Sequence, residues 1–135
     1  MGAITALKGA AVYSASKFGL RGFTTALYSE LKPHGVRVSG VYPSAVDTPM
    51  LKFEAQNNGS LLNFLSQPQQ VEAVVRAVER ALKSGRLEVY VPYFDSVLSR
   101  YLAVYPWFLD RLYPSLEWIG RRGLKKYLNK LGNRN

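Results

Sequence analysis

Cysteine is absent from this sequence, and histidine occurs only once, at His34. Disulfide scaffolds, zinc sites, Cys nucleophiles and Ser-His-Asp triads all depend on these residue types, so we expect no metal site and none of these catalytic systems. The chain also lacks any run of about 18 apolar residues, and no basic residues precede its N-terminal apolar stretch. We therefore expect neither a membrane span nor a secretory signal, and a cytoplasmic location.

The eleven glycines form no phosphate-binding loop of the GxGxxG, GxxxxGK or GxxxGxG type. Positive charge, in contrast, is abundant: 18 Lys and Arg stand against 9 Asp and Glu. Residues 111–135 hold 7 of the basic residues and only 1 acidic residue, which is +6 of the total net charge of +9. Such a segment suits an acidic surface of lipid, nucleic acid or partner protein.

Apolar periodicity and turn residues predict helices and strands in alternation. After the second strand, from Asp95, we expect two helices divided near Pro114, the first of them kinked or interrupted at Pro106. The expected elements are a helix over 13–32, a strand over 36–43, a long connection over 44–66, a helix within 67–85 with Pro68 near its first turn, and a strand over 87–92.

This order is typical of a parallel α/β sheet, in which helices cover both faces. Two short strands leave open edges, so the pattern predicts the C-terminal half of a doubly wound domain. We expect this half-domain to occupy residues 1–94, and an added helical segment to occupy 95–135.

Two stretches suggest a family. YSASKFGLRGF (13–23) and VRVSGVYPSAVDTPM (36–50) resemble the short-chain dehydrogenase/reductase family, in which a YxxxK pair opens a helix and the next strand leads into a Pro-Gly-x-x-x-Thr segment. The spacing alone is weak, because Tyr28 and Lys32 repeat it within the same predicted helix. Small residues around Tyr13 and the following PSAVDT segment favour the first pair, Tyr13 and Lys17.

Residues i and i+4 of a helix are neighbours, so Lys17 can place its ammonium near the Tyr13 phenol. A free tyrosine is too weak an acid for efficient proton transfer at neutral pH, and a nearby cation favours its ionised form. The alternative is that Tyr13 is an ordinary aromatic residue at a helix N-terminus and Lys17 a solvated charge.

The resemblance implies a Rossmann-type domain and an NAD- or NADP-dependent oxidoreductase that interconverts a secondary alcohol and a ketone. Tyr13 would exchange a proton with the substrate oxygen, and Lys17 would assist it and bind the nicotinamide ribose. Thr48 and the backbone around Val46, in the segment that begins with Pro43 and Ser44, would hold the nicotinamide carboxamide.

The sequence departs from the family pattern in two places. Ser44 stands where the family usually has glycine, which makes a turn with positive φ less comfortable. The family's catalytic serine lies about a dozen residues before the tyrosine, a position that falls at or before Met1. We therefore expect the isolated 135 residues to be inactive, and the alternative function is that of a binding module.

The connection after Thr48 is rich in apolar residues, among them Met50, Phe53 and Phe64. They would either form a lid over a lipophilic substrate or pack against the C-terminal helices, and the sequence favours neither interpretation.

The tail, residues 114–135, has a second candidate role. From Leu116, apolar residues and two glycines recur at helical spacing, with basic residues on the other side. This face would lie on an anionic membrane, with Tyr101, Tyr105, Trp107, Phe108 and Tyr113 at the interface, or pack on its own domain or a dimer mate. The resemblance implies a homodimer through the helix that starts at Tyr13, and we expect no nucleic-acid partner.

Overall fold

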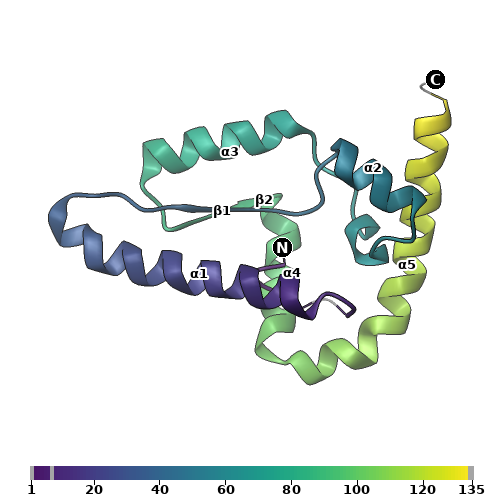
Figure 1. Cartoon of the computed structure of the whole chain (residues 1–135), viewed down its shortest axis with the longest axis horizontal. Coiled ribbons are helices and arrows are strands. Elements are labelled where there is room, and N and C mark those ends of the chain that lie inside the picture. Colours follow the sequence, from purple (N-terminus) through teal and green to yellow (C-terminus); the bar gives the residue numbers. More distant parts are fainter. Residues whose placement is uncertain (1, 7, 134–135) are drawn as a thin grey trace.

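The computed structural model describes residues 2–6 and 8–133 of the chain. Two strands and a set of helices alternate in the predicted order, and the chain then ends in two consecutive helices (Figure 1). The elements are α1 (Ala11–Leu31), the 3-10 turn η1 (Lys32–His34), β1 (Gly40–Pro43), α2 (Pro49–Gln56), the 3-10 turn η2 (Leu61–Phe64), α3 (Val71–Ser84), β2 (Glu88–Val91), α4 (Tyr93–Val104) and α5 (Pro106–Gly132).

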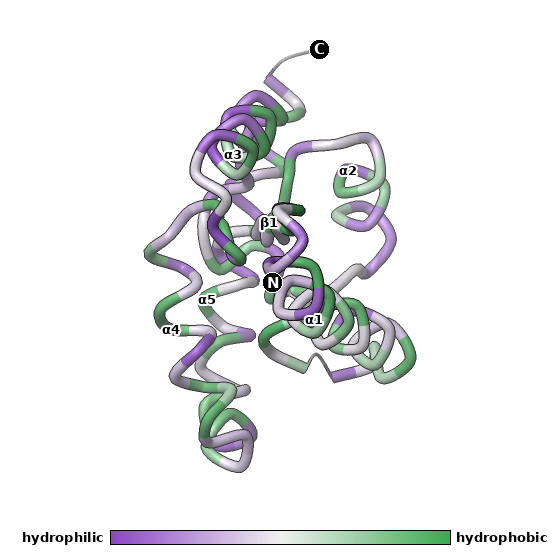
Figure 2. Tube along the Cα trace, turned by 90° about the vertical axis from the view of Figure 1, so that its left-hand side faces the viewer, coloured by the Kyte–Doolittle hydropathy of each residue, from purple (hydrophilic) through white to green (hydrophobic). Residues whose placement is uncertain are grey.

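The two strands form a parallel pair, with Gly40 opposite Glu88 and Pro43 opposite Val91. Helix α3 is the crossover that joins them, as parallel pairing requires. Helices α1 and α3 lie on opposite sides of the strands in both views (Figures 1 and 2). The predicted α/β class is therefore confirmed, and the two-stranded arrangement is consistent with a partial Rossmann-type fold.

Helix ends follow the local sequence signals. Gly35 and Gly85 take left-handed backbone conformations (φ 72° and 62°) directly after η1 and α3, where most side chains would be strained. The oxygen of the Thr48 side chain accepts a hydrogen bond from the Leu51 amide and so caps α2, and Pro49 occupies the first helical position.

The first predicted strand and the connection after it need correction. Only the second half of the segment 36–43 is a strand, because β2 offers just four residues for pairing. The predicted connection 44–66 contains α2 and η2, whose start is marked by the Thr48-Pro49 capping signal. Helix α3 begins only at Val71, so Pro68 lies ahead of the helix rather than in its first turn.

The predicted helix boundary near Pro114 is wrong. Pro114 lies inside α5. The interruption expected at Pro106 is confirmed, because the break between the two last helices falls at Tyr105, immediately before this proline. An interior proline costs about 3 kcal/mol, but the later turns of α5 pack against η2 and hold the helix together. Packing with residues distant in sequence thus overrides the local signal.

Two small apolar clusters hold the elements together. In the first, Ile4 of the N-terminal segment packs on Tyr42 of β1 and Tyr90 of β2, and all three are buried. The second joins α5 to α2 and η2, and its buried members are Leu51, Ala55, Phe64 and Tyr127, with Leu124, Leu128 and Leu131 packed against them. The segment 95–135 is thus docked on the preceding part of the chain.

Two glycines of α5 allow the helix to approach η2 closely. A Cβ atom at Gly120 would lie 2.3 Å from the carbonyl oxygen of Leu61, and one at Gly123 only 1.9 Å from that of Phe64. Both distances are far below any allowed contact, and the obstructing atoms belong to the backbone. Glycine is therefore required at both positions by the packing of the two segments.

A charged network fastens α1 to the sheet. Arg21 of α1 donates from Nε to Oε1 of Glu88 at 2.7 Å and from Nη2 to Oε2 at 3.3 Å, and the Tyr90 hydroxyl donates to the same carboxylate. Burial alone would raise the pKa of Glu88, but the hydrogen bonds from Arg21 and Tyr90 and the guanidinium charge outweigh it and hold that pKa below its usual value. Burial, together with the hydrogen bond to Glu88, raises the pKa of Tyr90 to about 12.

Replacing Gly123 by Ala should loosen the docking of α5. The added methyl group must displace η2 or α5, and overpacking of this kind costs about 1–3 kcal/mol. We expect the free energy of unfolding, measured by urea titration, to fall by that amount. Gly19→Ala is the matched control, because a Cβ there meets no atom within 4 Å and alanine favours helix by up to ~1 kcal/mol. Equal changes in the free energy of unfolding for Gly123→Ala and Gly19→Ala would contradict the close approach of α5 to η2.

The Glu88 carboxylate should make stability depend on acid pH. Because folding lowers its pKa, its contribution is present above the unfolded value of about 4.3 and is lost as pH falls through the folded value. Glu88→Gln should therefore remove about 1 kcal/mol at neutral pH and progressively less below pH 4, as followed by urea unfolding at several pH values. Glu79→Gln, an exposed site on α3, is the control, and a Glu88→Gln difference independent of pH would contradict the proposal.

Candidate functional site

The candidate site lies at the end of the sheet where the strands finish. Helix α1 runs antiparallel to β1, so its N-terminal end lies on the same side as the carboxyl end of β1 and the segment 44–48 (Figure 1). Ligands of open α/β sheets bind at this edge. Tyr13 and Lys17 stand in the first two turns of α1, whereas Tyr28 and Lys32 belong to its far end.

The Tyr13 side chain is 52% exposed at this edge. The chain passes close beside its ring at Gly2, where a Cβ would lie 2.7 Å from Cε1. Ser16 directs its hydroxyl to the Tyr13 carbonyl oxygen at 2.7 Å, so this serine is engaged within the helix. The phenol therefore remains accessible to a reactant.

Lys17 places Nζ 5.4 Å from the centroid of the Tyr13 ring. The other pair of the same spacing has nearly the same distance, with Nζ of Lys32 5.7 Å from the centroid of the Tyr28 ring. Helical geometry alone produces both contacts. What separates the pairs is their place along α1, because the first pair stands in the helix end that lies on the same side as the carboxyl end of β1.

That segment is tied to its neighbours on both sides. Pro43 pairs with Val91 at the end of β1, and the Ser44 amide donates to the Val91 carbonyl at 2.8 Å. Val46 forms an isolated parallel bridge with Gln69. Thr48 accepts the capping bond of α2 at 3.3 Å, and its own hydroxyl hydrogen remains able to donate.

Ser44, which replaces the family's glycine, does not take a positive φ. Among the described residues, the non-glycine position with positive φ is Asn58. The backbone strain expected for serine at this position is therefore not observed. The Ser44 Oγ atom is buried and has no hydrogen-bond partner within residues 2–6 and 8–133, so it retains its capacity to bind a polar group.

The apolar residues of the connection divide between two environments. Met50 and Phe53 on α2 are 69% and 65% exposed, whereas Phe64 on η2 is 2% exposed and packs against Tyr127 with ring centroids 5.4 Å apart. Phe64 thus belongs to the core, and the other two remain available for contact with a ligand.

The apolar face of the tail is turned inward. Gly120, Leu124, Tyr127 and Leu131 face α2 and η2, so most of the face that membrane contact through 114–135 would need packs on the chain itself, whereas Ile119 is 43% exposed. The upstream aromatics Tyr101, Tyr105, Trp107 and Phe108 stay exposed, while Tyr113 accepts a hydrogen bond from the Lys8 amide at 3.0 Å.

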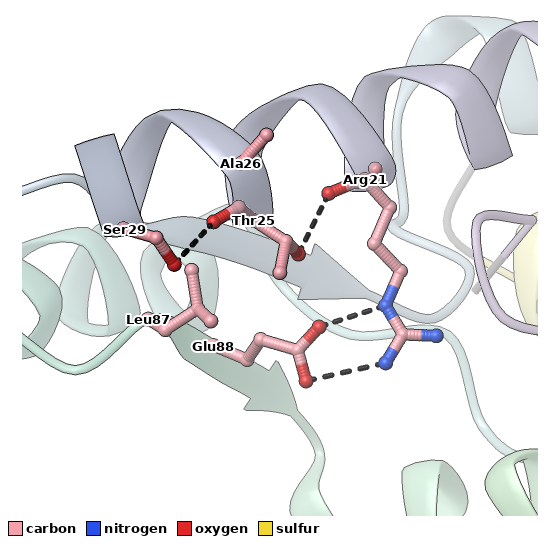
Figure 3. A pocket seen from close by; sticks show the side chains of 7 residues that line it. Arg21, Thr25, Ala26, Ser29, Leu87 and Glu88 are labelled. Atoms are coloured by element: carbon pink, nitrogen blue, oxygen red, sulfur yellow. Dashed lines mark hydrogen bonds and ion pairs between the residues drawn. The ribbon is translucent and has the colours of Figure 1, made fainter.

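An open groove of about 600 Å³ lies elsewhere, between the second half of α1 and the start of β2 (Figure 3). The Arg21–Glu88 pair forms its floor, and none of the sequence-predicted site residues lines it. No sequence signal revealed this pair, because 67 positions separate its members.

Residues 2–6 and 8–133 contain neither a metal-binding cluster nor a membrane-spanning helix. In the part of the chain that the structure describes, no three His, Asp or Glu side chains gather where they could hold a metal ion. Across residues 2–6 and 8–133, no helix combines the length and apolar character that a membrane crossing demands.

The family model and the relatives that match this chain point to the same family. Residues 1–59 match the family model described as short chain dehydrogenase. The ketoacyl reductase HetN of Nostoc sp. is 35% identical over 81% of this chain and 38% of its own length, and the 3-dehydrosphinganine reductase of Danio rerio is 39% identical over 51% and 23%. A putative ketoacyl reductase of the monensin polyketide synthase of Streptomyces virginiae is 58% identical over 30% of this chain and 15% of its own.

The chain thus spans less than two-fifths of the length of each of these relatives. No solved structure gives a significant match. The matching residues include both the YSASK helix and the strand and loop that end in DTPM, and the structure brings these to one edge of a parallel sheet. Over these residues the chain is accordingly similar to the short-chain dehydrogenase/reductase family.

Proposed function

We propose that the whole protein to which these residues belong reduces a ketone to a secondary alcohol with NADH or NADPH. The observation that supports this most directly is the Tyr13–Lys17 pair in the first turns of α1, at the helix end that lies on the same side as the carboxyl end of β1. The comparisons add that relatives are named ketoacyl reductase and 3-dehydrosphinganine reductase, and both names are those of reductases. The reductive direction of the proposal follows those names.

The residues present fit a nicotinamide cofactor. Thr48 keeps a hydroxyl hydrogen that can be donated to a carboxamide oxygen, and the buried Ser44 Oγ has no partner among the described residues. Lys17 would hold the nicotinamide ribose. When bound, the cofactor supplies the hydride, and the protein supplies position and protons.

In this mechanism Tyr13 is the general acid. Its exposed hydroxyl would donate a hydrogen bond to the ketone oxygen and transfer the proton as negative charge develops there. The Lys17 ammonium, within 5.4 Å of the ring centroid, would stabilise the phenolate that remains. A proton from solvent then restores the phenol.

The pyrophosphate of the cofactor needs a different part of the whole protein. The 135 residues contain no glycine loop suited to phosphate, and their curated relatives are much longer. We infer that these residues alone do not sustain turnover, and that the glycine loop and a further substrate-polarising group come from elsewhere in the protein.

The substrate is proposed to carry an apolar chain. Met50 and Phe53 expose large apolar surfaces on α2, directly after the segment assigned to the cofactor. An apolar substrate chain laid across them would remove this surface from water, at about 25 cal/mol for each Å². Phe64 would act beneath them as support for α2 rather than as a contact.

Tyr13→Phe in the full-length enzyme should lower kcat by about 10²–10⁴-fold, because it removes the proton donor and leaves the ring. The measurement is the oxidation of NADPH or NADH with a ketone substrate. Lys17→Met should also lower kcat and should raise the KM of the cofactor.

Tyr28→Phe and Lys32→Met are matched controls, since this pair has the same spacing and nearly the same geometry on the same helix. We expect both control variants to keep wild-type kinetics. Equal losses from the two tyrosine substitutions would contradict the assignment, and turnover by the 135 residues alone would show that they need no other part of the protein.

Phe53→Ala should raise the KM for ketones with long apolar chains by about tenfold while leaving the KM for a short ketone nearly unchanged. The physical reason is the loss of apolar surface that only a long substrate would cover. Lys52→Ala, an exposed neighbour on α2, is the control. If Phe53→Ala changed the KM for long and short ketones by a similar factor, Phe53 would not be part of the substrate-binding surface.

A further inference from the structure

A hydrogen bond joins the C-terminal helix to the loop after β1. The hydroxyl of Tyr127 in α5 donates to Oδ1 of Asp47 at 2.5 Å, across 80 positions of the sequence. Asp47 stands between Val46 and Thr48, the two positions that the proposed function assigns to the nicotinamide carboxamide. The C-terminal helix is therefore attached directly to the backbone segment that would hold the cofactor.

The segment has a second anchor on its other side. The Asp47 amide donates to the Gln69 carbonyl, and the Gln69 amide donates to the Ala45 carbonyl, both at 2.8 Å. These two bonds hold the backbone of residues 45–47 against Gln69, which precedes α3. The side chain of Asp47 is turned to α5 instead, so the segment is held between two separate parts of the chain.

The position of Tyr127 is itself tightly determined. Its ring is 7% exposed and packs against Phe64 at a centroid distance of 5.4 Å. Gly120 and Gly123 permit this depth, because a side chain at either position would meet the carbonyl groups of η2. The hydroxyl therefore reaches Asp47 from a helix that has little freedom to shift.

The chemistry of the pair makes it an effective anchor. A hydroxyl that donates to an ionised carboxylate forms a hydrogen bond about twice as strong as one between neutral groups. The bond restrains the Asp47 side chain, and the backbone of Asp47 leads directly into Thr48 and the cap of α2. Only Asp47 and Thr48 therefore stand between the Tyr127 hydroxyl and the first turn of α2.

We propose that Tyr127 is a positioning residue, which acts through Asp47 to fix the segment 44–48 for the cofactor and α2 for the substrate. The C-terminal helix is in this way a component of the site rather than an appendage. The anchoring follows from the structure of these residues, whereas the identity of the bound group rests on the proposed function.

The anchoring is tested on the 135-residue chain by amide hydrogen exchange, which needs no cofactor or substrate. Tyr127→Phe and Asp47→Ala each remove one partner of the bond, the first without loss of ring packing and the second without change in α5. We expect amides 45–52 to exchange about tenfold faster in these variants, while those of α3 keep wild-type rates. Tyr113→Phe is the matched control, because it removes from α5 a hydroxyl that contacts Lys8 instead.

A selective increase over 45–52 in at least one of the two variants, absent from Tyr113→Phe, supports the anchor. No change, or a uniform change over the whole chain, in both variants overturns it.

The consequence for binding is tested on the full-length enzyme. Tyr127→Phe should raise the KM of the nicotinamide cofactor about tenfold, and Tyr113→Phe should not. An active enzyme in which Tyr127→Phe leaves the cofactor KM unchanged would overturn the positioning role. If the wild-type protein reduces no ketone with NADH or NADPH, the proposed function fails, and hydrogen exchange still decides whether Tyr127 anchors the loop.

Discussion

The arrangement of the site depends on the parallel pairing of four residues of β1 with four of β2. Because the strands run in one direction, α3 must cross back between them, and both carboxyl ends meet at one edge of the sheet. The Arg21–Glu88 pair then fixes α1 against β2, so the N-terminal turns of α1 lie at this same edge. The YSASK helix and the PSAVDT segment come together only through this pairing, since the sequence separates them by some thirty residues.

Position along the helix, rather than spacing, separates the two tyrosine and lysine pairs. The ammonium-to-ring distances of 5.4 and 5.7 Å are what any i, i+4 pair on a helix can adopt. The proposed chemistry also needs a place for a cofactor and a substrate, and the first pair stands in the helix end on the side where β1 finishes and segment 44–48 begins. Tertiary structure thus gives a physical reason to prefer Tyr13 where the motif alone is ambiguous.

The C-terminal helix shows how one pattern admits several functions. An apolar face opposite a basic face suits a membrane surface, a partner or the protein's own core. In this chain the apolar face packs mainly against α2 and η2, and Gly120 and Gly123 are the residues that permit the contact. Glycines that weaken an apolar face for lipid are well suited to close packing against backbone carbonyls. The basic residues remain on the opposite, exposed side of α5.

The sequence by itself determined the α/β class, the family resemblance, the alternation of the main helices and strands, and the C-terminal ends of α1 and α3, because glycines and periodicity act over a few neighbouring residues. It did not determine the length of β1, the continuity of α5 through Pro114, or the separation of Phe64 from Met50 and Phe53. Each of these depends on contacts between distant segments: the four partners that β2 offers, the packing of α5 on η2, and the side of α2 that this packing covers. The Asp47–Tyr127 and Arg21–Glu88 pairs belong to the same group, since no local pattern brings together side chains 80 and 67 positions apart.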